Sequence, residues 1–181
     1  MSEDDIAFRR SGTQHSPDQV FTLTYRELRA IAHRRLVARG PRGTLTTTAL
    51  VHEAYLKLVD QSRAGWQDLA HFHALASLAM RHVLVDRARE RAAVKRGGAR
   101  PQITLDDDIV AAEDQPDALL QLHDALERLA ALNPRLAQVV DCRFFGGLTE
   151  QETAAALEIT TRTVQRDWVK ARVLLRRLLT S

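Results

Sequence analysis

LTEQETAAALEITTRTVQRDWVKARVLLRRLL, residues 148–179, predicts two short helices joined by a tight turn. Thr149 and Glu152 have the spacing of a capping box, which starts a helix expected over 150–157. Thr160 is placed to cap a second helix that runs to the end of the stretch. The intervening turn of about three residues is typical of a helix-turn-helix unit.

The second of these helices has two chemically different faces. Its apolar side gathers Val164, Trp168, Ala171, Leu175 and Leu178. Arginines lie on the opposite side, and arginine suits guanine while glutamine suits adenine. A recognition helix places such residues in the major groove at its N-terminal end. The residues that we expect to contact DNA are Thr161, Arg162, Gln165 and Arg166, with Arg172 on the flank. An ordinary amphipathic hairpin is the alternative.

The rest of the chain is also predicted to be helical. Ala, Leu, Arg and Glu are abundant, and they lose little side-chain freedom in a helix. Apolar residues recur at helical spacing in five further segments. These segments are approximately 21–36, 48–59, 70–95, 119–132 and 134–145. We therefore predict an all-α protein without a large sheet.

Charge is distributed unevenly along the 181 residues. Residues 1–103 contain 17 Lys and Arg against 10 Asp and Glu, residues 104–117 contain six acidic residues and no basic one, and residues 118–181 contain nine against seven. The acidic strip is predicted to be a flexible linker between two basic blocks. A polyanion is the natural partner of such blocks, and solvated helix faces are the alternative. The basic residues in the second half of the predicted helix 70–95 and directly after it are Arg87, Arg89, Arg91, Lys95 and Arg96.

Several protein classes do not fit the sequence. The single cysteine, Cys142, cannot form an internal disulfide, which favours the reducing cytoplasm, and neither a secretory signal nor a membrane-spanning segment is expected. No glycine-rich phosphate loop or nucleophile elbow occurs. His52 and Glu53 begin a zinc-protease pattern that lacks its second histidine, because position 56 is leucine. We expect no catalytic residues, no metal and no cofactor.

Three segments together resemble bacterial RNA polymerase sigma factors of the extracytoplasmic-function type. Residues 148–179 resemble the promoter-reading helix-turn-helix of that family. TTALVHEAYLKL (47–58) is similar to its polymerase-binding helix, and FHALASLAMRHVLVDRARERAAVKR (72–96) to its basic DNA-melting helix. The segments occur in the family's order on either side of a variable linker. The chain departs from the common pattern at Ala49, His52 and His82.

The resemblance implies two small helical domains with separate tasks. An N-terminal tail (1–18) would precede a region-2-like domain (19–100) that binds core polymerase and the minus-ten element. An acidic linker (101–117) would lead to a region-4-like helix-turn-helix domain (118–181) that binds the minus-thirty-five element.

The resemblance also implies site residues and partners. Leu50, His52, Glu53 and Leu56 fall where the family contacts polymerase, and Arg81 joins Arg87 and Arg89 in the helix that holds the melted strand. The implied partners are the beta-prime clamp helices and beta flap of core RNA polymerase and promoter DNA, with an anti-sigma factor as an optional further partner. A helix-turn-helix regulator that acts without polymerase is the alternative function.

Overall fold

The computed structural model describes residues 26, 28–30, 47–61, 69–94 and 116–180, and within them every regular element is a helix. The elements are α3 (Thr47–Gln61), α4 (Leu69–Val94), α5 (Pro116–Leu132), α6 (Pro134–Val140), the π-helix η3 (Asp141–Phe145), α7 (Glu150–Ala156) and α8 (Thr161–Thr180). The predicted all-α fold class is therefore confirmed. No helix in these ranges is both long and apolar enough to cross a membrane.

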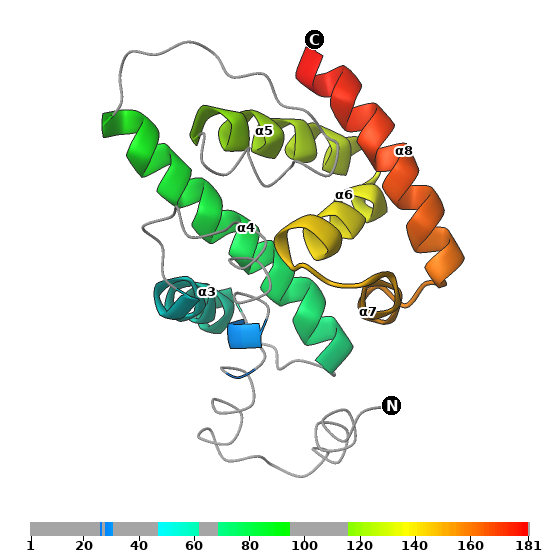
Figure 1. Cartoon of the computed structure of the whole chain (residues 1–181), viewed down its shortest axis with the longest axis horizontal. Coiled ribbons are helices and arrows are strands. Elements are labelled where there is room, and N and C mark those ends of the chain that lie inside the picture. Colours follow the sequence, from blue (N-terminus) through cyan, green and yellow to red (C-terminus); the bar gives the residue numbers. More distant parts are fainter. Residues whose placement is uncertain (1–25, 27, 31–46, 62–68, 95–115, 181) are drawn as a thin grey trace.

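α4 is the central element of the molecule (Figure 1). It contacts α3 on one side and α5, η3 and α7 on the other, while α8 packs against α5, α6 and α7. A single buried cluster joins all of these elements except α7, and it includes Leu58 of α3, Phe72 of α4, Leu126 of α5, Phe145 of η3 and Leu175 of α8. The helices on either side of the predicted linker therefore share one core.

Parts of the predicted domain organisation lie outside the described residues. These parts are the tail 1–18 and the linker up to residue 115. Most of the predicted helix 21–36 lies there too, although residues 28–30 are helical and Leu28 is fully buried. The division into two domains remains a prediction.

Local sequence explains where α6, α7 and α8 begin. Pro134 is the first residue of α6, where its missing N–H has no intrahelical partner to lose. The Thr149 hydroxyl accepts from the Glu152 N–H at 3.2 Å, and the Glu152 carboxylate accepts from the Thr149 N–H at 2.7 Å. The Thr160 hydroxyl accepts from the N–H of Thr163 at 3.1 Å and caps α8. The predicted capping box and the predicted cap at Thr160 are confirmed.

The segment between α6 and α7 differs from the regular helix that the sequence predicts. Asp141–Phe145 form a turn of π-helix, in which the Gly146 N–H donates to the Asp141 carbonyl at 2.8 Å. The wider turn leaves Asp141, Cys142 and Phe145 buried, and η3 packs against α4. Gly147, which follows, has a left-handed backbone with φ of 60°, a conformation that glycine adopts easily.

Gly146 allows η3 to approach α4 closely, so Gly146→Ala is expected to destabilise the protein. A methyl group there would collide with the Ser77 hydroxyl and lie 2.8 Å from the Cys142 carbonyl oxygen. Overpacking of this kind costs about 1–3 kcal/mol, which urea denaturation can measure. Adding Ser77→Gly should relieve part of the clash, so the double variant should lose less stability than the two single losses combined. Simple additivity would contradict this contact.

Candidate nucleic-acid interface

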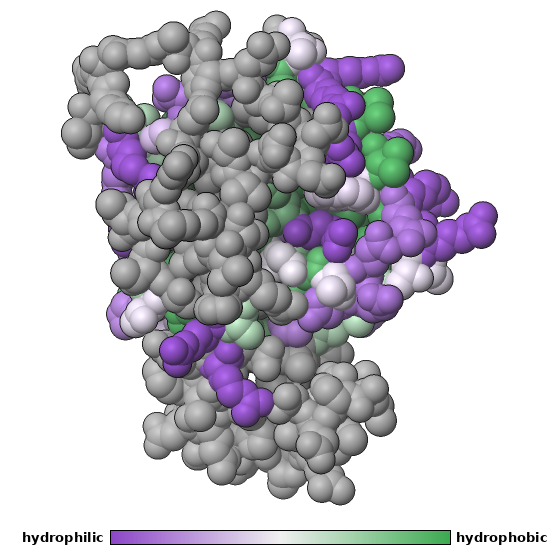
Figure 2. Space-filling view, in the orientation of Figure 1, coloured by the Kyte–Doolittle hydropathy of each residue, from purple (hydrophilic) through white to green (hydrophobic). Residues whose placement is uncertain are grey.

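The N-terminal half of α8 presents its predicted DNA-contacting side chains to solvent. Thr161, Arg162, Gln165 and Arg166 are all exposed, and the Arg166 side chain is 67% accessible. The Gln165 amide donates to the Glu150 carboxylate of α7 at 2.7 Å. Arg172, two turns further along, is half-buried. Figure 2 shows hydrophilic side chains projecting from the edge of the molecule where α8 lies in Figure 1.

The opposite face of α8 is fixed to the other C-terminal helices. Val164, Ala171 and Leu175 are buried, as the face pattern predicted. Asp167, which the pattern did not single out, is buried as well, and its carboxylate accepts from the Arg135 guanidinium at 2.7 Å. This ion pair ties α8 to the start of α6, so the exposed face is held in one orientation.

A second cation also supports α8. The Arg143 guanidinium of η3 lies 5.8 Å from the ring centre of Trp168 and donates to the Leu148 carbonyl at 2.7 Å. A guanidinium over an indole ring is an attractive contact. Trp168 therefore has the structural role that its place on the apolar face predicted.

α7 and α8 meet across the short segment Leu157–Thr160. Glu158 within it has a left-handed backbone with φ of 53°, and the Ile159 N–H donates to the Ala154 carbonyl at 2.9 Å. The left-handed residue reverses the chain without a long loop. The turn thus sets α8 against α7 with its N-terminal end at the surface.

The basic half of α4 is tied by ion pairs to neighbouring carboxylates. Arg87 binds the Glu53 carboxylate of α3 through two nitrogens, and Arg89 lies 3.1 Å from the Asp86 carboxylate. The Arg91 guanidinium donates to the Arg87 carbonyl at 3.4 Å. Lys95 and Arg96 lie outside the described residues. Arg89 is the exposed member of this group.

Arg81, unlike the exposed Arg89 and Arg166, does not lie on the outer surface. Its side chain is only 6% accessible, and its Nε is 3.1 Å from the Asp141 carboxylate. A second guanidinium nitrogen is 3.0 Å from the Glu127 carboxylate of α5. In this conformation Arg81 cannot reach DNA, because the C-terminal helices cover it.

The predicted polymerase-contacting residues of α3 divide between the core and the surface. Leu50 is fully buried in the main core, and a polymerase contact through it remains a prediction. His52 is exposed and Leu56 is 54% exposed. Glu53 is half-buried, and its carboxylate forms an ion pair with Arg87. The outer face of α3 therefore offers His52 and Leu56.

The chain was compared with protein families, curated proteins and solved structures. A family described as ECF sigma factor matches residues 6–181. The chain belongs to the ECF sigma factor family. No curated protein and no solved structure gave a match. Members of this family are regulatory proteins that act in transcription initiation, and membership implies core RNA polymerase and promoter DNA as partners.

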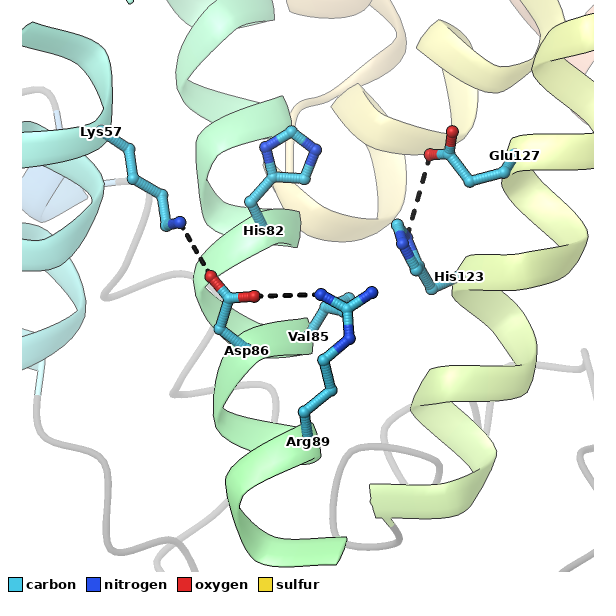
Figure 3. A pocket seen from close by; sticks show the side chains of 7 residues that line it. All are labelled: Lys57, His82, Val85, Asp86, Arg89, His123 and Glu127. Atoms are coloured by element: carbon cyan, nitrogen blue, oxygen red, sulfur yellow. Dashed lines mark hydrogen bonds and ion pairs between the residues drawn. The ribbon is translucent and has the colours of Figure 1, made fainter. Parts of the chain in front are cut away.

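A polar pocket of about 380 Å³ lies between α3, α4 and α5 of this ECF sigma factor (Figure 3). Asp86 lies between two cations, with Lys57 Nζ at 2.8 Å and the Arg89 guanidinium at 3.1 Å. His82 and His123 come from different helices and line the same pocket. The His123 Nδ1 has no hydrogen-bond partner among the described residues and lies 3.9 Å from the Glu127 carboxylate. This pocket, at the junction of three helices, was not predicted from the sequence.

Both imidazoles of this pocket favour the neutral form. Burial, assisted by the charges of Arg81 and Lys57, lowers the pKa of His82. Burial and the Arg81 charge lower the pKa of His123, with Glu127 opposing them. Protonating either ring therefore costs the folded sigma factor more than the unfolded chain.

The sigma factor is expected to lose stability in mild acid through these rings. Because the folded-state pKa of His82 is depressed, its stabilising effect is present above the ordinary value of 6.5 and is lost as pH falls through the folded-state pKa. His82→Gln should reduce the loss of unfolding free energy between about pH 7.5 and about pH 5. Urea denaturation across this range measures how the unfolding free energy changes with pH in the variant and in the wild type. An equal pH dependence in the variant and the wild type would contradict a lowered pKa of His82 in the folded protein.

Proposed function

We propose that this ECF sigma factor binds core RNA polymerase through the outer face of α3 and reads duplex promoter DNA with α8. The basic half of α4 would hold the strand that is separated at the downstream element. The observation that most strongly supports the proposal is the construction of α8. Its inner face is anchored through Asp167, and its N-terminal half exposes Arg162 and Arg166.

The exposed end of α8 has the chemistry needed for sequence-specific reading. Arg162 and Arg166 are one helical turn apart, so both point to the same side of α8. Guanidinium groups so placed can bind guanine edges in pairs, and neighbouring hydroxyl and amide groups can contact phosphates or adenine. To contact an adenine, Gln165 would have to exchange its bond with Glu150 for a bond to the base.

The α3 face suits a protein partner instead of DNA. A leucine with half its surface in water at the centre of a helix is a candidate anchor for a hydrophobic contact. Glu53 and Arg87 join α3 to α4, so that a partner seated on α3 would also fix the position of the basic helix. Binding of polymerase and positioning of the melted strand would then use one rigid pair of helices.

Arg89→Ala tests the role assigned to α4. Arg89 is exposed and its loss leaves Asp86 paired with Lys57, so the fold should be retained. We expect the reconstituted holoenzyme to protect the upstream element normally and to open the downstream element several-fold less, as read by permanganate reactivity of unpaired thymines. Arg128→Ala, an equal loss of charge at an exposed position of α5, is the matched control. Equal weakening of upstream protection and strand opening would contradict the division of tasks.

A further inference from the structure

The side-chain amide of Gln165 is held by a carboxylate from the neighbouring helix. Its Nε2 donates to a Glu150 carboxylate oxygen at 2.7 Å, and this bond joins the exposed end of α8 to the first residue of α7. The capping box of Thr149 and Glu152 fixes the backbone at the start of α7, so Glu150 leaves that helix at a defined place. Gln165 is thus a predicted DNA-contacting residue whose side chain is oriented from outside α8.

The chemistry of this bond determines which way the amide faces. An ionised carboxylate only accepts hydrogen bonds, whereas a glutamine amide has a donating nitrogen and an accepting oxygen. The nitrogen of Gln165 must therefore face Glu150, and the amide oxygen lies on the side away from it. While this bond lasts, Gln165 offers an acceptor to a base in the major groove.

The four bases differ in how well they match such an acceptor. Guanine and thymine present acceptor oxygens in the major groove, and these repel an amide oxygen. Adenine presents its amino group beside the N7 acceptor, so a paired contact needs the amide nitrogen that Glu150 holds. Cytosine presents an amino group without a neighbouring acceptor. The oriented amide therefore matches the cytosine of a C·G base pair.

We propose that Glu150 is a positioning residue for promoter reading, which turns Gln165 so that α8 selects a C·G pair at one place in the upstream element. The inference rests on the proposed function and adds the base pair that this part of α8 recognises. Arg162 lies about one turn before Gln165 on the same side of the helix. Because arginine suits guanine, the neighbouring side chain is compatible with the same kind of base pair.

The charge of Glu150 and its hydrogen bond have separable effects on DNA binding. DNA phosphates repel a carboxylate whatever the base sequence, so removing the charge should raise the affinity for all sequences. Removing the hydrogen bond should change the base preference instead. Glu150→Gln removes the charge and keeps an acceptor oxygen for the Gln165 amide, whereas Glu150→Ala removes both. The two variants therefore form a matched pair.

The test is selection of bound DNA from a library with a randomised upstream element, using core polymerase with each full-length variant. Gln165→Ala identifies the base pair concerned, because preference should disappear there. At that pair the wild type and Glu150→Gln should prefer C·G. Glu150→Ala should shift the ratio of A·T to C·G by about fivefold or more towards A·T, since the freed amide can make the paired contact with adenine. In the Gln165→Ala background, Glu150→Ala should not change the preference further.

Three results would overturn the positioning role of Glu150. The first is the absence of any base pair whose preference depends on Gln165, and the second is a wild-type preference for A·T at that pair. The third is an unchanged preference in folded Glu150→Ala protein. If this variant does not fold, the comparison of the wild type with Gln165→Ala, a change at an exposed position, still decides. A wild-type chain that enriches no sequence would instead refute the proposed function.

Discussion

Leu56→Asp is expected to abolish most of the affinity of the chain for core RNA polymerase while leaving the fold intact. The side chain is 54% exposed on α3, so a charge there meets water in the free protein. In the complex the same charge would be buried against an apolar surface without a partner. Loss of a central interface anchor costs about 2 kcal/mol or more, which corresponds to about 30-fold in the dissociation constant. Fluorescence anisotropy of a labelled chain titrated with core polymerase measures this dissociation constant.

Two comparisons isolate the effect of Leu56. Leu132→Asp introduces the same charge at a leucine that is 72% exposed at the end of α5, and polymerase affinity should be retained. Leu50→Ala, in contrast, removes a fully buried side chain and should cost about 2–5 kcal/mol of unfolding free energy. Equal polymerase affinities for the Leu56 and Leu132 variants would contradict the proposal that α3 forms part of the polymerase interface.

Arg166→Ala is expected to weaken binding of the upstream promoter element by about tenfold or more. A bidentate arginine contact to guanine contributes about 1–3 kcal/mol of discrimination, and tenfold corresponds to about 1.4 kcal/mol. The Arg166 side chain is 67% exposed, and its contact with Asp167 is secondary because Arg135 also binds that carboxylate. Footprinting of the upstream element by the holoenzyme should show the loss.

The sequence dependence of the loss distinguishes base reading from simple charge attraction. For Arg166→Ala the loss should be larger on the preferred upstream sequence than on a scrambled one, because a base contact is removed. Arg128→Ala removes an equal charge from α5 and should have little effect on either sequence. A uniform loss on both sequences would assign Arg166 to the phosphate backbone instead of the bases.

Features set by neighbouring residues along the chain could be predicted from sequence. The start of α7 depends on Thr149 and Glu152, which are three positions apart, and the start of α6 depends on Pro134. The two faces of α8 follow from helical spacing alone, and Val164 and Ala171 are buried as that spacing requires. The family resemblance of the sequence is likewise confirmed by the match over residues 6–181.

Features set by contacts between distant residues could not be predicted. Arg81 lies in an arginine-containing helix that reads as a DNA surface, yet its partners Glu127 and Asp141 come from 46 and 60 positions later in the chain. From the sequence alone, Asp167 resembles a solvated acid next to an arginine. In the structure, the Arg135 guanidinium binds its carboxylate. The π-turn that begins at Asp141 likewise packs against α4, which is distant in the sequence.

Leu50 shows that a residue's position in a matching segment does not decide on which face of the helix it lies. It belongs to a segment similar to a polymerase-binding helix, but a helix has an inner and an outer face. The 100% buried Leu50 and the exposed Leu56 are six residues apart, and only the tertiary packing on α4 decides which of the two faces solvent. Spacing within one apolar helix could not separate them.

The central claim is that the chain directs core RNA polymerase to particular promoters. Its most direct test is transcription in vitro from a library of DNA templates with randomised upstream sequence, using core polymerase with and without the chain. We predict transcripts that depend on the chain and come from templates enriched in two short sequence blocks at a fixed separation. Transcription equal to that of core polymerase alone, without enrichment of any sequence, would contradict the account.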